Sequence, residues 1–472
     1  MTDSAESEGV FQHPGPTSAV DNESADADAM ERSVVDFSFR VPAIAVVLVT
    51  GLILRLILAT LPGFSSDISV FQFWSNQLAE HNPWNFYDSD FFIDYAPGYL
   101  YVLWWIGKLH QIFHFSNSDF EYILKIPPIL ADLASAYLLY RMLDSQKLGL
   151  RVGSAALYLL FPATLLVGSV WGQTDSLLAF LLLLSVYFIS RDRPVAGAVT
   201  FIAAFMVKPQ AMAALPFLAL WIMRRHPPRW IEVSSRLKLP VPPGVWLRTI
   251  GAAVAVALVL LVPFFTYTPW DLYDKLRFSV DVYPYSTVNA YNFWAIIDPS
   301  FRPDDVDYRG ISYQTWGLIL FAVSIAAILL AMRKSEGTGL LALGTALSVL
   351  VFYVFLTRMH ERYLFPFFLP FLVACVLARS RFLWTAFIAL GAIHFLNLYY
   401  PYSYYALVFP PAGEAPAAPF SQFVYDLVEE ANLVASGFST IEILSIATVA
   451  AVPILVAAAY KLSSRKPTGE AT

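Results

Sequence analysis

Residues 61–97 read LPGFSSDISVFQFWSNQLAEHNPWNFYDSDFFIDYAP and lie between two apolar segments of the chain. The stretch holds acidic and aromatic side chains but no lysine or arginine; its acids are Asp67, Glu80, Asp88, Asp90 and Asp94. The flanking segments are long enough to enter a bilayer. An acidic, aromatic loop held at a membrane face is a natural place for a catalytic site.

Composition defines the broad class of the protein. The 472-residue chain is 57% hydrophobic and only 14% charged, which is more apolar surface than a soluble core can hide. The sequence therefore predicts an all-α, polytopic helical protein with membrane lipids around it. The one cysteine, Cys375, excludes an intramolecular disulfide and disfavours a thiol mechanism. We expect no nucleic-acid partner.

The chain divides by composition into five parts. Residues 1–40 are acidic and polar, so we expect a disordered cytoplasmic tail. Residues 41–265 form a first transmembrane module that includes the external loop 62–96. Residues 266–314 are rich in Tyr, Trp and Pro and are expected to form an ordered external lid. Residues 315–465 form a second transmembrane module, and residues 466–472 a cytoplasmic tail.

Basic residues flank most of the short connections, which are therefore expected to be cytoplasmic. Residues 62–96, 266–314 and 402–436 then face outward in a multi-pass plasma-membrane or inner-membrane protein. If the N-terminus is cytoplasmic, however, eight complete crossings before residue 266 would place the loop 266–314 inside. One apolar run must be re-entrant, or two must form one crossing; the candidates are residues 97–142 and the pair around Lys208-Pro209. We expect about twelve crossings.

Five motif regions occur in segments that we expect to face outward. They are the first loop, with Asp67, Phe71, Trp74 and the tract DYAPGY at 94–99, and then WGQTDS at 171–176, KPQ at 208–210, NAYNFW at 289–294 and MHERY at 359–363. In this order, over roughly residues 40–400, they resemble the GT-C class of membrane glycosyltransferases. The narrower resemblance is to the prokaryotic mannosyltransferase-like branch related to the GPI-anchor mannosyltransferases. Many relatives have two adjacent prolines where this chain has Ala96-Pro97.

The resemblance implies a GT-C fold and a defined reaction. A hexose, with mannose favoured, would move from a polyprenyl-phosphate donor to an envelope glycan, glycolipid or protein acceptor on the external face. The donor sugar, the acceptor and the anomer are not determined by these residues. The residues establish no cofactor and leave a requirement for a divalent metal open, with Asp88 and Asp90 as weak ligand candidates.

Inverting glycosyl transfer needs a carboxylate that accepts the proton of the attacking hydroxyl. Asp67 is the first candidate, in a short helix that would place Phe71 and Trp74 on the membrane-facing side. The alternative is that Asp67 only caps this helix. Asp94 is the second candidate, either for acceptor binding or for a secondary catalytic role. The alternative is that Asp94 only caps the helix that begins near Pro97.

The phosphate leaving group needs positive charge, for which Arg362 and Lys208 are the candidates, with His360 orienting the donor. Their alternatives are snorkelling to the interface or pairing with a nearby acid. A further group of polar and aromatic side chains could contact the sugar or the acceptor: Trp171, Gln173, Asp175, Asn289, Asn292 and Trp294. Arg55, Lys125 and Asp132 lie inside predicted spans, where structural pairing is the preferred reading.

Two other classes of protein fit parts of the pattern. A glycolipid transporter or flippase could use the buried charges and the break at Lys208-Pro209 as a substrate path without transfer chemistry. A structural subunit of an envelope complex would make the loop acids incidental. No phosphate loop, dinucleotide fingerprint, zinc spacing or nucleophile elbow is present in the sequence.

Overall fold

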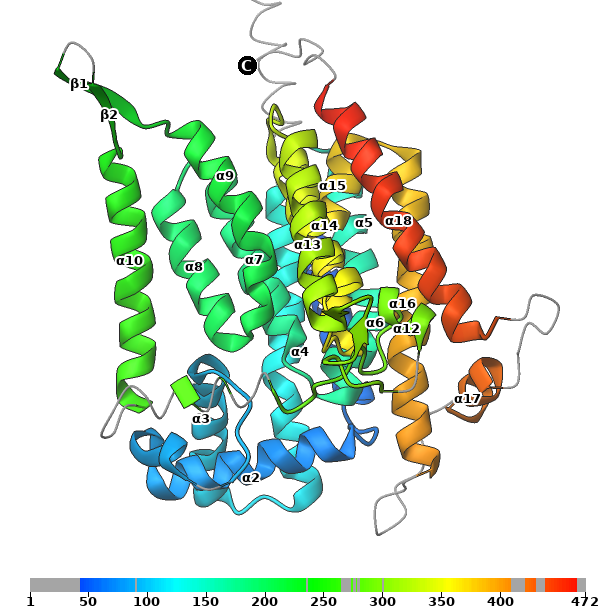
Figure 1. Ribbon diagram of the computed structural model, residues 1–472. Helices are drawn as coiled ribbons and strands as arrows, with labels where there is room; N and C mark the ends of the chain where they lie inside the picture. Colours follow the sequence, from blue (N-terminus) through cyan, green and yellow to red (C-terminus); the bar gives the residue numbers. More distant parts are fainter. Residues whose placement is uncertain are drawn as a thin grey trace, which may run out of the picture.

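The computed structural model describes residues 43–89, 91–234, 237–264, 273–274, 277, 281–298, 301–408, 421–429 and 438–464. The expected cytoplasmic tails at 1–40 and 466–472 lie outside these ranges, as do parts of the loops 266–314 and 402–436. Within them the chain is almost wholly helical (Figure 1).

The first half of the chain contains a helix over Ala43–Leu58 and then nine labelled α-helices or helical turns before the break at Lys208. Their bounds are α2 Ser65–His81, η1 Pro83–Asp88, α3 Pro97–Phe113, α4 Asn117–Met142, α5 Leu148–Leu160, α6 Pro162–Thr164, η2 Leu165–Trp171, α7 Asp175–Ser190 and α8 Pro194–Val207. After the break follow η3 Pro209–Ala214, α9 Leu215–Arg225, the antiparallel strands β1 Arg229–Ser234 and β2 Leu237–Val241, α10 Gly244–Leu261 and η4 Val262–Phe264.

The second half begins with the described part of residues 266–314, which we call the outer loop, and ends with five long helices and two short ones. The elements are α12 Phe293–Ile297, β3 Asp307–Tyr308, β4 Ile311–Ser312, α13 Tyr313–Ala331, α14 Thr338–Phe355, η5 Glu361–Leu364, α15 Phe365–Ala378, α16 Arg381–Val408, α17 Ser421–Glu429 and α18 Thr440–Ser463. The expected external loop at 402–436 therefore starts later than predicted, because α16 continues to Val408.

Seven helices in the described part of the chain are long and apolar enough to cross a membrane. They are α4, α10 with η4, α13, α14, η5 with α15, α16 and α18, and α5 with α6 and η2 forms an eighth that is bent by 49°. Shorter apolar helices cover Ala43–Leu58, α7 and α8. The predicted all-α, polytopic membrane fold is confirmed, whereas the number of about twelve crossings stays a prediction.

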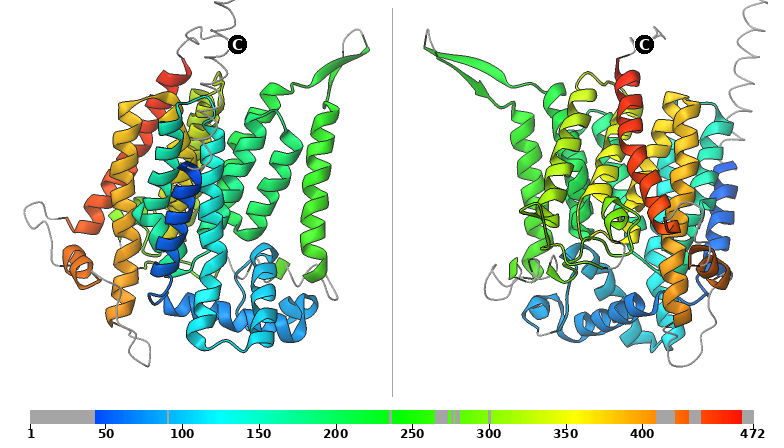
Figure 2. Two further views of the ribbon diagram at one scale, coloured as in Figure 1. Left: turned by 180° about the vertical axis from the view of Figure 1, so that it is seen from behind. Right: turned by 45° about the vertical axis from the view of Figure 1, so that its right-hand side comes forward.

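Helix α3 does not stand in the bundle like its neighbours. It lies beside α2 at the end opposite the β1–β2 hairpin and the C-terminal end of α18 (Figures 1 and 2). Close packing of the two helices requires Gly107, where a Cβ atom would collide with the backbone oxygen of Ser75. If α3 does not cross, the chain reaches residue 265 after one crossing fewer, and the outer loop returns to the side of residues 62–96.

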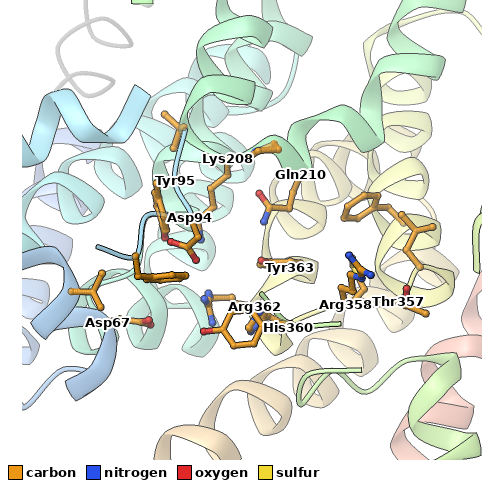
Figure 3. A pocket seen from close by; sticks show the side chains of 18 of the residues that line it. Asp67, Asp94, Tyr95, Lys208, Gln210, Thr357, Arg358, His360, Arg362 and Tyr363 are labelled. Atoms are coloured by element: carbon orange, nitrogen blue, oxygen red, sulfur yellow. The ribbon is translucent and has the colours of Figure 1, made fainter. Parts of the chain in front are cut away.

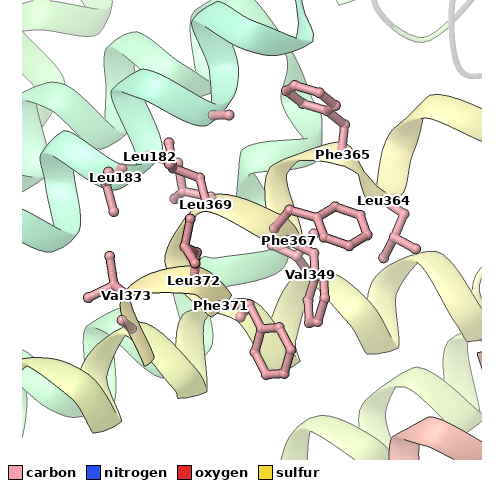
Figure 4. Packing of buried hydrophobic residues seen from close by; sticks show 14 of the residues in the cluster. Leu182, Leu183, Val349, Leu364, Phe365, Phe367, Leu369, Phe371, Leu372 and Val373 are labelled. Carbon is pink, nitrogen blue, oxygen red and sulfur yellow. The ribbon is translucent and has the colours of Figure 1, made fainter. Parts of the chain in front are cut away.

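Helix α15 forms the centre of the bundle. It is apolar on every face, so it must be covered on every face. Figure 4 shows its Phe367 and Phe371 packed with Val349 of α14, while Leu369 lies toward Leu182 of α7. By contrast, α10 stands at the edge of the bundle, and only 6% of its apolar window is buried (Figure 2).

Buried charges inside the bundle are paired, as the sequence indicated. Arg55 lies 3.4 Å from Asp132, and both side chains are fully buried. Lys125 Nζ donates to Glu121 Oε1 over 2.7 Å and to the carbonyl of Leu61 over 2.6 Å. Glu121 Oε1 also accepts the backbone N–H of Gly63, so this pair holds the segment that leads into α2.

Cysteine labelling tests the orientation of the bundle. We expect Ser65→Cys and Gln422→Cys, both exposed positions, to react with an impermeant maleimide on intact cells in a Cys375→Ala background. Exposed Glu336, in the short connection between α13 and α14 that follows Arg333 and Lys334, supplies the matched inside control as Glu336→Cys. Labelling of Glu336→Cys but not Ser65→Cys on intact cells would contradict the assigned orientation.

Candidate functional site

A cavity of about 450 Å³ lies between α2, the segment before α3, the break after α8, the outer loop and the turn after α14 (Figure 3). It brings together five of the residues singled out in the sequence: Asp67, Asp94, Lys208, His360 and Arg362. These residues come from three regions far apart in the chain. Their convergence on one cavity is what a substrate site requires.

Asp67 lies in the first turn of α2 and does not cap it. The N-cap residue is Phe64, and no side chain caps this helix. Asp67 Oδ2 instead accepts hydrogen bonds from Trp171 Nε1 over 2.8 Å and Gln173 Nε2 over 2.6 Å. The other oxygen, Oδ1, accepts none from the described residues, so one face of the carboxylate remains available in the cavity.

The expected direction of Phe71 and Trp74 was wrong. Both side chains are buried, at 2% and 1% exposure, and both line the cavity instead of facing lipid. The reason is the close contact of α2 with α3, which turns this face of α2 toward Tyr95 and Tyr99. The indole N–H of Trp74 donates to the carbonyl of Phe92 over 2.9 Å, which fastens the segment before α3.

Trp171 and Gln173 reach Asp67 because the backbone before them is unusual. Residues Leu165–Trp171 form a π-helical segment, which ends at Gly172 with φ of +86°. A side chain at Gly172 would also meet Ile68 of α2 at 2.9 Å. Trp171 stacks on Phe64 at 4.6 Å between ring centroids. Neither Trp171 nor Gln173 lines the cavity; both act on it through Asp67.

Lys208 follows the last turn of α8, where Pro209 breaks the helix, and its side chain is almost fully buried. Its Nζ donates to Asp175 Oδ2 over 2.7 Å and to Gln173 Oε1 over 3.1 Å. The alternative of pairing with an acid is therefore observed for Lys208. Asp175, expected to contact the sugar or acceptor, is 1% exposed and serves as this partner.

Arg362 lies in η5 and reaches the cavity from the turn between α14 and α15 (Figure 3). One terminal nitrogen donates to Glu361 Oε1 over 2.7 Å. Its Nε is buried and has no hydrogen-bond partner among the described residues. A buried guanidinium N–H without an acceptor is costly, and an anion in the cavity would satisfy it.

Asp94 does not cap α3, whose N-cap residue is Ala96 without a side-chain hydrogen bond. Its carboxyl instead lines the cavity near Asp67, Arg362 and Lys208 (Figure 3). Burial raises the pKa of Asp94 to about 6, with Arg362 opposing the rise and Asp67 adding to it. A carboxyl that titrates near neutral pH can accept a proton and release it under working conditions.

His360 lies in the turn before η5 and lines the cavity. Burial, followed by the charges of Arg362 and Lys208, lowers its pKa well below the usual value. The imidazole is therefore neutral at pH 7 and adds no positive charge for a phosphate. Its ring meets Tyr283 edge-on at 4.9 Å, and its backbone pairs with Val288 and Asn289 of the outer loop.

The three residues expected from the NAYNFW motif do not line the cavity. The Asn292 side chain caps α12 by accepting the backbone N–H groups of Trp294 and Ala295. Trp294 Nε1 donates to the carbonyl of Phe355 over 2.8 Å, and the carbonyl of Asn289 accepts from Asn397. These contacts hold the outer loop on the bundle, which is a structural task that the motif did not reveal.

A metal site is not supported by the described residues. No group of three or more His, Cys, Asp or Glu side chains lies within reach of one ion in the ranges that the structure describes. Asp90 and the side chain of Asp88 lie outside those ranges, so the sequence prediction for them is unchanged.

The sequence reading missed three contributors to the cavity. Gln210 and Tyr283 both line it. Arg358, also in the lining, donates to Asp304 Oδ2 and Asp281 Oδ1, each over 2.7 Å, and so fastens the outer loop. Gln210 was available in the KPQ motif, and Arg358 stands four residues before Arg362 in the same turn. No local pattern pointed to Tyr283.

Comparisons with known proteins give a likeness to solved structures but no family match. No protein-family model and no curated protein matches the chain. Among solved structures, the crystal structure of ArnT from Cupriavidus metallidurans bound to undecaprenyl phosphate is similar at 14% sequence identity and a TM-score of 0.46. The match covers 89% of this chain and 75% of ArnT. At these values the likeness carries no conclusion about what this chain binds or does.

Proposed function

We propose that the protein is a GT-C type membrane glycosyltransferase that moves a hexose from a polyprenyl-phosphate donor to an acceptor hydroxyl. The proposal depends on one observation: a single cavity is lined by the carboxylates of Asp67 and Asp94 and by Arg362, whose Nε has no acceptor among the described residues. This is the charge pattern that transfer from a phosphate requires: a proton acceptor for the nucleophile and a cation for the leaving group.

The reaction is a single displacement at the anomeric carbon. The acceptor oxygen forms a bond to that carbon while its proton passes to a carboxylate, and the bond from carbon to phosphate oxygen breaks. The electron pair stays on the polyprenyl phosphate, where Arg362 stabilises the charge. Orientation by Trp171 and Gln173 favours Asp67 as the base. The raised pKa of Asp94 makes it the alternative base.

The walls of the cavity suit a lipid-borne substrate. Leu318 of α13 and Phe352 and Leu356 at the end of α14 line one side of it. Only 17% of the apolar window of α13 is buried, so this helix leaves an apolar surface for lipid beside Leu318. A polyprenyl chain could remain in the bilayer while its phosphate sugar enters. Mannose and an envelope glycan, glycolipid or protein acceptor are proposed on the sequence resemblance alone.

The buried charges inside the spans do not support the alternative of a transporter or flippase. Arg55, Asp132 and Lys125 are fully buried, paired and absent from the cavity lining. Charges satisfied by one another stabilise the fold and present nothing to a passing headgroup. A purely structural subunit would have no need of the unpaired Nε of Arg362.

The base is tested by neutral substitution. Purified wild-type protein should transfer label from polyprenyl-phosphate mannose to a total lipid or glycan acceptor fraction, and Asp67→Asn should transfer at least ~100-fold more slowly with donor binding nearly unchanged. Glu80→Gln, which neutralises an exposed carboxylate on the same helix, is the matched control. A dead Asp94→Asn beside an active Asp67→Asn would make Asp94 the base.

Removal of the Arg362 side chain, the proposed phosphate ligand, should weaken donor binding. Arg362→Ala deletes charge-assisted hydrogen bonds that contribute roughly 1.5–3 kcal/mol each, so donor affinity should fall by about one to two decades. Arg362→Lys should recover only part of this loss, because an ammonium cannot reproduce the planar fork. Arg333→Ala, at an exposed position on the opposite end of the bundle, is the control. Unchanged donor affinity in folded Arg362→Ala would place the phosphate elsewhere.

Asp94 makes donor binding depend on pH. Below pH 6 its carboxyl is neutral, and above pH 6 it adds a negative charge near the phosphate, so affinity for a phosphodiester donor should fall as pH rises from 5 to 7. The donor must be a diester, because a phosphate monoester titrates near pH 6 itself. Asp94→Asn should bind with one affinity throughout, and an unaltered pH dependence in this variant would contradict the assignment.

A further inference from the structure

Lys208 has few donors left for a substrate. An ammonium group has three N–H bonds, and two of them point at Asp175 Oδ2 and Gln173 Oε1. The Nζ atom also lies 5.7 Å from the centre of the Tyr95 ring, which occupies a further side of the group. Arg362 differs, because its buried Nε has no partner among the described residues.

The amide of Gln173 can take only one orientation in this arrangement. Its oxygen accepts from Lys208 Nζ and Tyr95 Oη, each over 3.1 Å, and its nitrogen donates to Asp67 Oδ2 over 2.6 Å. An ammonium only donates and a carboxylate only accepts, so the reverse orientation would lose both contacts. Gln173 is 1% exposed, so contact with solvent does little to compensate for a rotated amide.

We propose that Lys208 and Asp175 are positioning residues that act on Asp67 through the amide of Gln173, and that Lys208 is not a phosphate ligand. Asp175 holds Lys208, Lys208 holds the oxygen of Gln173, and the nitrogen of Gln173 holds Asp67. Without the ammonium, only Tyr95 Oη and the backbone N–H of Thr174, over 3.2 Å, still hold the Gln173 oxygen, and an amide that turns this oxygen toward Asp67 displaces the carboxylate. The inference rests on the glycosyltransferase function proposed above.

The ion pair also explains why Lys208 would add little to phosphate affinity. Asp175 lies 2.7 Å from the ammonium and both side chains are almost fully buried, so the pair is close to neutral as seen from the cavity. The two roles therefore predict different kinetic signatures. A phosphate ligand changes donor affinity, whereas a positioning residue changes the rate at saturating donor.

The test is a double-mutant cycle between Lys208 and Gln173, with kcat and donor dissociation constant measured separately. Lys208→Met should lower kcat by about 10- to 100-fold and leave donor affinity within about twofold of wild type. Gln173→Met should show a similar loss, and the double variant should be no slower than the slower single variant, because both substitutions break one chain of contacts. Lys208→Gln keeps an N–H donor without the charge, and should retain more kcat than Lys208→Met.

Three results would overturn the inference. One is a loss of donor affinity in Lys208→Met comparable to that in Arg362→Ala, and another is a double variant whose loss is the product of the single losses. The third is equal damage by Lys208→Gln and Lys208→Met, which would make charge the only requirement. If Lys208→Met does not fold, Lys208→Gln enters the same cycle. Absence of transfer by wild-type protein would defeat the proposed function itself, whereas transfer with any of the three results defeats only this inference.

Discussion

Two hydrogen bonds to one oxygen of Asp67 join helix α2 to the helical bundle at the place where the chemistry is proposed. Trp171 and Gln173 supply them from a turn that exists only because a π-helical segment ends at Gly172. The contact of Gly63 with Glu121, just before α2, holds the start of this helix as well. The position of Asp67 therefore depends on a backbone distortion in another part of the chain.

Around this junction, nearly every charge has a partner inside the protein. Lys208 is held by Asp175, Arg358 by Asp304 and Asp281, and one terminal nitrogen of Arg362 by Glu361. Such pairing is expected where water is scarce, since an isolated charge would be too costly. Two groups in the cavity depart from this pairing. The Nε of Arg362 has no acceptor among the described residues, and the pKa of the Asp94 carboxyl is raised to about 6.

The sequence predicted the class of fold and five of the residues that line the cavity, because both leave strong local signals. Apolar runs predict spans. The order of the motifs, together with the need for a proton acceptor and a cation, singled out Asp67, Asp94, Lys208 and Arg362. Their partners could not be predicted, because pairing depends on tertiary contacts. The inward direction of Phe71 required knowledge of how α2 packs on α3.

Other differences between the sequence-based predictions and the structure come from features that have no distinct sequence signal. A π-helical segment has no sequence signature that separates it from the surrounding apolar helix, so the route from Trp171 to Asp67 was hidden. Asn292 looked like a sugar ligand, since an amide that caps a buried helix has the same sequence appearance as one that binds a hydroxyl. The sequence left residues 97–142 open as a re-entrant segment, and the packing of α3 on α2 through Gly107 could not be predicted from it.

The central claim is that this cavity holds the phosphate sugar of a polyprenyl donor, and the most direct measurement is a cryo-EM structure with an inert phosphonate analogue of polyprenyl-phosphate mannose. The account predicts density for the phosphonate within hydrogen-bond distance of Arg362 Nε, the sugar next to Asp67 and Asp94, and the lipid leaving along α13 and α14. Density for the analogue at another site, with this cavity empty, would contradict it.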